Sequence, residues 1–220
     1  MKRLNNEILK FEVPFQDDHM IIVDKPAGLA IQSRNKRADL ETILSENTGI
    51  QVHPITRLDQ VVSGLVIFAK SKKAAALFSR LIKEKKIHKT YLAVVEGVMS
   101  ETNSGISLKH NLIKIKNKAL ICENGDESEL SFEVVKTFDN YSLLEVHTET
   151  GRFHQIRCQL QAIGHSIKGD IKYGAKRTNK IPGIMLHCHR LAFAHPVSGE
   201  YLDLCSPVPD NINWSVFNIN

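Results

Sequence analysis

The chain has 220 residues, of which 42% are hydrophobic, enough for one sizeable domain with a proper core and far from a disordered composition. Its net charge is +5, from 29 Lys and Arg against 24 Asp and Glu, which favours polyanionic partners without identifying one. The sequence has no secretory core segment and no run near the roughly 18 apolar residues of a membrane span. We therefore expect a cytoplasmic protein with no membrane partner.

In the first half of the chain, strand-like runs alternate with helical patterns. A strand at 20–24 precedes a helix at 39–46, in which Leu40, Ile43 and Leu44 share one side. A strand at 65–70 leads into a helix at 71–87, whose first turn Ser71 can cap. The apolar stripe of this helix consists of Ala74, Leu77, Phe78, Leu81 and Ile82. A strand at 90–96 follows.

The second half is mostly strand, with runs at 112–122, 131–137, 141–147, 184–194 and 200–205. One helix fits 153–163, with Ile156, Leu160 and Ile163 inward and Gly164 as its C-terminal stop. Helices scattered among antiparallel-looking strands indicate the α+β class, a mostly antiparallel mixed sheet with flanking helices. No repeat or Gly/Ser-rich linker divides the chain, so residues 1–220 are predicted to form a single domain.

Arg57 and Asp59 lie two residues apart, just before the strand at 65–70. In an extended segment their side chains point to the same face while Leu58 points inward, so a cation and a carboxylate can share one pocket. Ser63 and Gly64 then allow a tight turn into the strand. The same pattern also fits an aspartate that bonds nearby backbone amides and an arginine in a solvated ion pair. This segment alone does not decide between the two.

Further motifs accompany residues 56–64 in a fixed order. They are Lys25-Pro26-Ala27-Gly28, Lys89-Thr90-Tyr91-Leu92-Ala93, Gly151-Arg152-Phe153-His154-Gln155-Ile156-Arg157, Gly164-His165-Ser166-Ile167 with Gly169-Asp170, Tyr173-Gly174, and Leu186-His187 to His195-Pro196. Together, over about residues 23–196, they resemble the RluA-type pseudouridine synthases, which isomerise uridine in ribosomal and transfer RNA. The resemblance implies a pseudouridine synthase catalytic fold with a central cleft, an RNA partner (rRNA or tRNA), and chemistry that needs no metal and no cofactor.

The resemblance also implies roles for individual residues. Asp59 matches the essential carboxylate, which acts either as a nucleophile or as a base toward the ribose. Arg157 would keep that carboxylate charged in a dry pocket, although the sequence does not show which way it faces. Tyr91 and Leu186 would contact the two faces of a flipped uracil. Arg57 would fill the space left by the base, contact the RNA backbone, or simply pair with Asp59.

Lysines and histidines outside these motifs allow two interpretations. Lys114, Lys116 and Lys118 alternate with other residues, so in a strand they would line one face and track phosphates, or would protect an exposed edge. The lysine-rich runs at 83–89 and 172–180 each fit an ordinary solvated surface, but together they could surround a groove. His187 and His189 would share a strand face, but no further ligand has suitable spacing, so we expect local hydrogen bonds and no metal site.

Three positions depart from the family pattern. Thr56 stands where histidine is common, and Val62 and Phe153 stand where threonine is common. These departures leave open a non-catalytic RNA-binding protein or chaperone on the same fold. Nucleoside hydrolysis is another alternative, but it needs a second carboxylate beside the bond. We expect the enzyme to act as a monomer without a separate N-terminal RNA-binding module.

Overall fold

The computed structural model describes residues 11–33, 39–100 and 105–218, and all statements on structure concern these ranges. Their strands are β1 (Glu12–Gln16), β2 (Met20–Lys25), β3 (His53–Pro54), β4 (Ser63–Ala69), β5 (His88–Glu96), β6 (Ile106–Ile115), β7 (Lys118–Ile121), β8 (Asp126–Thr137), β9 (Tyr141–Thr148), β10 (Leu186–Ala194) and β11 (Tyr201–Cys205). Their helices are α1 (Leu40–Thr48), α2 (Lys72–Lys83) and α3 (Gln155–Ala162), with short 3₁₀ helices η1 (Ile171–Tyr173) and η2 (Ser215–Phe217).

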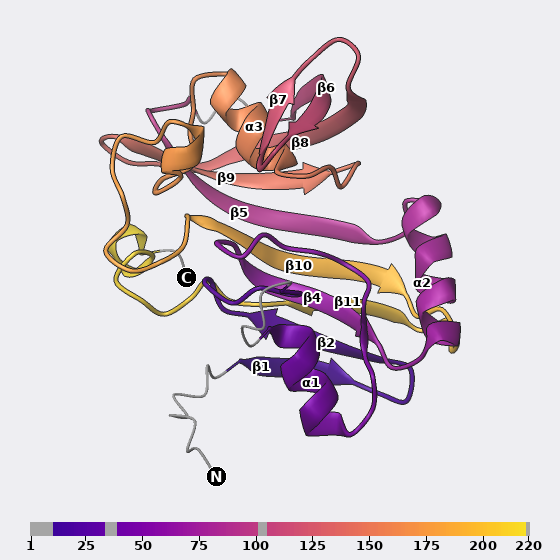
Figure 1. Cartoon of the computed structure of the whole chain (residues 1–220). Helices are drawn as coiled ribbons and strands as arrows, with labels where there is room; N and C mark the ends of the chain where they lie inside the picture. The colour runs from indigo at the N-terminus through magenta and orange to yellow at the C-terminus, as the bar shows by residue number, and fades with distance from the viewer. Residues whose placement is uncertain (1–10, 34–38, 101–104, 219–220) are drawn as a thin grey trace.

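All of these strands belong to one sheet, with the main order β1-β2-β4-β10-β5-β9-β8-β6-β7 (Figure 1). β3 pairs with β4, and β11 pairs with β10. Every pairing is antiparallel except that of β10 with β4. The predicted α+β class with a mixed, mostly antiparallel sheet is therefore confirmed. None of the described helices has the length and apolar character needed to cross a membrane.

The central strands are apolar along their whole length because both faces of the sheet are covered. In β4, Val66 and Phe68 pack into a small core under α1, and Leu65 and Ile67 pack into the main core on the opposite face. The main core continues beneath α2, where Phe78 is fully buried. Such a strand reads as a continuous apolar run, which is why its position could be predicted without an alternating pattern.

Local capping fixes the helix ends. The Asp39 carboxylate accepts a hydrogen bond from the Thr42 amide at 2.8 Å, and α1 ends at Gly49 with φ of 69°. The predicted Ser71 cap is confirmed, since its hydroxyl accepts from the Ala74 amide at 3.1 Å. α2 ends at Lys83 rather than at residue 87, and Ile82, predicted to lie in its apolar stripe, is 46% exposed.

The prediction of one strand at 112–122 is wrong, because this segment is the turn of a hairpin. β6 runs into the turn, Lys116 adopts a left-handed φ of 53°, and β7 returns with Lys118 opposite Ile115. Lys114 pairs with Ala119 instead. The three lysines therefore do not line one face of a single strand: Lys114 is on β6, Lys116 is in the turn and Lys118 is on β7.

Strand β10 joins the two parts of the sheet. It lies between β4 and β5, which are not neighbours, and so connects β1, β2 and β4 to the strands from β5 onward. Its parallel pairing with β4 places Cys188 opposite Gly64. A Cβ atom on Gly64 would lie 2.4 Å from the Cys188 carbonyl oxygen, and Gly64 has φ of 112°. Only glycine fits this close approach.

Candidate active site

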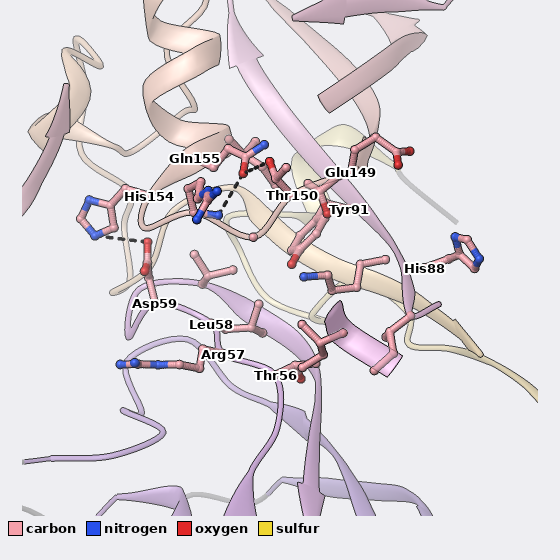
Figure 2. Close-up of a pocket in the computed structure, with 18 of the residues that line it drawn as sticks. Thr56, Arg57, Leu58, Asp59, His88, Tyr91, Glu149, Thr150, His154 and Gln155 are labelled. Atoms are coloured by element: carbon pink, nitrogen blue, oxygen red, sulfur yellow. Dashed lines mark hydrogen bonds and ion pairs between the residues drawn. The ribbon is translucent and has the colours of Figure 1, made fainter. Parts of the chain in front are cut away.

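A cavity of about 660 Å³ opens between the loop that precedes β4 and the turn that leads from β9 into α3. This volume is within the range of small-ligand pockets. Its walls include five of the seven residues predicted to act in catalysis or substrate binding, together with one to which no role was assigned, and Figure 2 shows most of them. They are Arg57, Asp59, Tyr91, Arg157, Leu186 and, in addition, His154.

Buried polar groups hold the loop that carries Asp59 in place. The hydroxyl of Thr56, at the position where histidine is common, accepts a hydrogen bond from the Ile67 amide at 2.9 Å. The fully buried Lys25 ammonium donates to the carbonyls of Pro26 and Leu29 at 2.9 Å and of Gln60 at 3.4 Å. These bonds tie the loop after β2 to the loop of Asp59.

Burial changes the pKa of the Lys25 side chain. Desolvation lowers its pKa to about 7, although the negative charges of Asp59 and Asp24 oppose this shift. The sequence motif around Lys25 was recognised, but no role was assigned to the residue. Its amine lies beside the Asp59 loop, and its charged form interacts electrostatically with Asp59.

Arg157 faces the pocket and contacts Asp59, which settles the orientation that the sequence left open. Its Nη1 donates to Asp59 Oδ2 at 2.7 Å. Its Nε and Nη2 donate to the two oxygens of Asp170 at 2.6 and 2.8 Å, and its guanidinium lies 4.9 Å from the centre of the Tyr173 ring. Burial lowers the pKa of Arg157, but the bonds and charges of Asp170 and Asp59 outweigh burial and raise it. The guanidinium is therefore a permanent cation.

Asp170 is a site residue to which the sequence gave no role. Its carboxylate is almost completely buried, and both oxygens are bound to Arg157. It sits in the Gly169-Asp170 segment of the recognised motifs, so the signal was present. Since both oxygens are occupied and shielded from solvent, Asp170 does not act as the second free carboxylate that hydrolysis requires.

Tyr91 and Leu186 come from adjacent strands of the central sheet. Tyr91 is buried in β5, and burial together with the neighbouring Cys188 thiol raises its pKa well above the usual value. It is thus a neutral aromatic ring at the pocket wall (Figure 2). Leu186, at the start of β10, is also buried and contributes an apolar surface to the same pocket.

Arg57 does not pair with Asp59. Its side chain is exposed at the pocket rim and makes no hydrogen bond or ion pair with any residue that the structure describes. Figure 2 shows it extending away from the Asp59 carboxylate, which points toward His154. Leu58 between them is partly buried and packs against both hydrophobic cores.

The predicted lysines lie at different places around the site. Lys83, Lys85 and Lys89 of the first run line the pocket, whereas no residue of 172–180 does. Lys114 lies outside the pocket lining, with its Nζ 4.5 Å from the centre of the Phe153 ring. Lys116 is in the exposed turn of the β6–β7 hairpin.

The histidines of β10 make local hydrogen bonds, as predicted. His187 is buried, with Nδ1 2.9 Å from the Ser63 hydroxyl and Nε2 3.2 Å from the Ser206 carbonyl. His189 Nδ1 lies 2.6 Å from the same carbonyl. Burial lowers the pKa of His187 to about 4, so it is a neutral core residue. Among the described residues, no group of three His, Cys, Asp or Glu side chains is placed to hold a metal ion.

Comparison with known proteins points to one family. Residues 19–162 match the family model of RNA pseudouridylate synthase. The chain is 31% identical to ribosomal large subunit pseudouridine synthase D of Nitrosomonas europaea, over 94% of this chain and 64% of the relative. It is 30% identical to tRNA pseudouridine synthase C of Pasteurella multocida, over 91% of this chain and 92% of the relative.

The fold of the chain also resembles that of a solved RNA pseudouridylate synthase structure. Human RNA Pseudouridylate Synthase Domain Containing 1 superposes with a TM-score of 0.79 and 25% identity, covering 94% of this chain and 87% of the human chain. The family match includes the Asp59 loop, Tyr91 and Arg157, which form one pocket here. The chain therefore belongs to the RNA pseudouridylate synthase family.

Proposed function

We propose that this protein is an RNA pseudouridine synthase that isomerises uridine in ribosomal or transfer RNA, with Asp59 as its essential carboxylate. The observation that carries the proposal is the contact between Asp59 and the buried Arg157 within a pocket that Tyr91 and Leu186 also line. The names of relatives that act on ribosomal and transfer RNA support these substrates.

The reaction rearranges bonds without adding or removing atoms overall. The bond from ribose C1′ to uracil N1 breaks, the base turns, and C1′ bonds to C5, which releases its proton while N1 becomes protonated. Asp59 either attacks the sugar as a nucleophile or removes a ribose proton as a base. In both cases Asp59 reacts as a carboxylate, and Arg157 Nη1 holds that carboxylate at 2.7 Å.

The pocket wall suits an extruded base. The neutral Tyr91 ring offers a stacking surface, which contributes on the order of 1–3 kcal/mol per base and offsets part of the cost of unstacking. Leu186 supplies an apolar contact that excludes water, and water would otherwise hydrolyse the broken glycosidic bond. We assign these two residues to uracil binding on this basis.

The rim suits an RNA backbone. Arg57 has no protein partner among the described residues, and Lys83, Lys85 and Lys89 line the same pocket. We propose that Arg57 contacts the RNA backbone or fills the space left by the flipped base. Lys114 and Lys116 would add phosphate contacts from the β6–β7 hairpin, where both are exposed.

We also propose that the protein works as a monomer in the cytoplasm. Every residue assigned above comes from one chain, so no second copy is needed to complete the pocket. The cytoplasmic location is proposed from the RNA classes named for the relatives, ribosomal and transfer RNA. Light scattering of the purified protein measures the oligomeric state directly.

Tritium release tests the proposed reaction. RNA labelled with tritium at uracil C5 should lose label when incubated with the native protein, and nucleoside analysis should show pseudouridine. Asp59→Asn removes the charge but keeps the shape and should abolish release. Asp203→Asn, at an exposed aspartate far from the pocket, is the matched control and should react like the native protein.

Other outcomes would contradict the proposal. Equal release by native protein and Asp59→Asn would remove Asp59 from the reaction. Free uracil as the product would indicate hydrolysis, and tight RNA binding without release on any ribosomal or transfer RNA would indicate a non-catalytic RNA-binding protein.

A further inference from the structure

His154 occupies an unusual place at the start of α3. Its backbone φ is 54°, a left-handed conformation that residues other than glycine adopt rarely, and its side chain makes no capping bond to the helix. The imidazole is 7% exposed and stacks on the Phe153 ring with centres 3.8 Å apart. A strained backbone kept at a pocket wall suggests a function for the side chain that it places there.

The imidazole lies within a chain of hydrogen-bonding groups that ends at Asp59. The Ala119 amide of β7 donates to the Tyr173 hydroxyl oxygen at 2.7 Å. The Tyr173 hydroxyl lies 2.9 Å from His154 Nδ1. His154 Nε2 lies 3.4 Å from Asp59 Oδ2, the contact drawn in Figure 2.

These contacts determine where the imidazole proton resides. Because the Tyr173 oxygen already accepts from Ala119, its own proton points to His154 Nδ1 at 2.9 Å rather than to the Ala119 carbonyl at 3.4 Å. Nδ1 is then an acceptor, and a neutral ring carries its proton on Nε2, facing Asp59. The opposite tautomer would place a lone pair of Nε2 against the carboxylate.

The surroundings of the imidazole favour its neutral form. Asp59 and Asp170 favour the imidazolium, whereas Arg157 and Lys172 disfavour it. Desolvation, together with the two cations, outweighs the two carboxylates and lowers the pKa of His154 to about 4. At neutral pH the residue is therefore an N–H donor without a net charge, next to a permanent cation.

Both donors that approach Asp59 meet the same oxygen. Arg157 Nη1 bonds Oδ2 at 2.7 Å, and His154 Nε2 approaches Oδ2 as well. Oδ1 contacts no donor among the described residues. The Arg157 bond holds Oδ2, the His154 ring lies beside the same oxygen, and Oδ1 is left without a donor among these residues.

We propose that His154 is a positioning residue for Asp59: as the Nε2–H tautomer set by Tyr173, it holds Oδ2 together with Arg157 and leaves Oδ1 to react with the ribose. The reactive role of Oδ1 rests on the proposed pseudouridine synthase activity. The His154–Asp59 contact is long for a hydrogen bond in the free protein and shortens when the substrate excludes water from the pocket.

The tautomer can be tested without measuring activity. In protein labelled with ¹⁵N at its histidines, the His154 signals are those missing from His154→Gln. At pH 7 we expect a neutral ring with its proton on Nε2, and a shift toward the Nδ1–H form in Tyr173→Phe. An imidazolium at pH 7, a proton on Nδ1 in the native protein, or no effect of Tyr173→Phe would overturn the proposal.

Two matched variants test the positioning role in turnover. The Gln amide nitrogen can reach the place of Nε2, whereas the Asn nitrogen reaches only that of Nδ1, and Asn tolerates the left-handed backbone. We expect His154→Asn to lower kcat about 10- to 100-fold with KM within about 3-fold of native, and His154→Gln to restore kcat to within about 3-fold. Equal loss in both variants, unchanged kcat in His154→Asn, or an effect on KM alone would contradict the role.

The two measurements separate the two proposals. If native protein lacks turnover on every RNA while the NMR signals show the Nε2–H tautomer, the proposed function fails and the hydrogen-bond arrangement stands. If turnover is present and the tautomer is wrong, only the role of His154 fails.

Discussion

Arg157 organises the site because three of its N–H groups bind two carboxylates. Two of the three bonds go to Asp170, which is 13 residues further along the chain and buried. The third bond direction, toward Asp59, is then fixed by the planar geometry of the guanidinium. Asp170 thus controls the orientation of the carboxylate of Asp59 without contacting it.

Asp170→Asn should damage both stability and turnover. The amide keeps one acceptor but removes the charge that balances a buried guanidinium, and breaking a buried ion pair costs about 3 kcal/mol or more. We expect the free energy of unfolding in urea to fall by that amount and kcat to fall more than KM rises. Asp203→Asn is the control, since Asp203 forms the same two-bond pair with Arg190 at the exposed surface.

The control should leave the urea midpoint close to that of native protein, because exposed ion pairs contribute little. Equal midpoints for Asp170→Asn and native protein would show that the buried pair is not needed for the fold.

Secondary-structure elements place the pocket residues through one close approach. The Asp59 loop enters β4 at Gly64, directly opposite Cys188 of β10, the next strand in the sheet. β10 also brings Leu186 to the pocket and pairs Cys188 with Tyr91 of β5. The spacing of β4 and β10 therefore sets the distance between the Asp59 loop and the apolar wall of the pocket.

Gly64→Ala should disturb this spacing. Its Cβ would lie 2.4 and 2.5 Å from the Cys188 carbonyl oxygen and amide nitrogen, atoms that cannot move without separating the strands. We expect a loss of unfolding free energy on the order of 3 kcal/mol, from crowding and backbone strain together, measured by urea denaturation. Gly49→Ala is the matched control, because Gly49 also has positive φ but its Cβ would meet no atom within 4 Å.

Strain alone should cost Gly49→Ala about 1 kcal/mol. Equal losses in the two variants would mean that the close contact of β4 with β10 adds nothing to the cost at Gly64.

Sequence reasoning succeeded where the signal is local. Ser71 begins α2 because a hydroxyl before an apolar stripe is itself the cap. It failed at Lys116, since lysine rarely adopts positive φ and nothing in the local sequence marks it as the turn residue. The sequence also did not show which way the Arg157 side chain points, because α3 is buried on nearly every side and no exposed face marks its orientation. Its partner Asp170 is fixed by tertiary packing alone.

At the scale of the whole molecule, two buried histidines make the fold sensitive to acid. Burial lowers the pKa of His154 and of His187 to about 4, whereas histidine in an unfolded chain titrates near 6.5. Between these values the unfolded state binds protons that the folded state does not. Stability is therefore fully present above about pH 6.5 and falls as the pH drops toward 4.

His187→Gln tests this linkage. Each histidine in that window should add about 1.4 kcal/mol per pH unit to the slope of unfolding free energy against pH. The variant should be less stable than native protein at pH 7, because it disturbs buried bonds to Ser63 and Ser206, yet its slope between pH 6.5 and 4 should be shallower by that amount. Parallel curves for variant and native protein would show that His187 does not titrate abnormally.

The position of β10 constrains when the site can exist. During synthesis, the segments that carry Asp59 and Arg157 leave the ribosome well before residues 186–194, yet the strand that holds β4 and β5 together is made from those last residues. A nascent chain that ends earlier carries two half-sheets without their common strand. The pocket therefore cannot assemble on a nascent chain until residues 186–194 have been made and have left the ribosome.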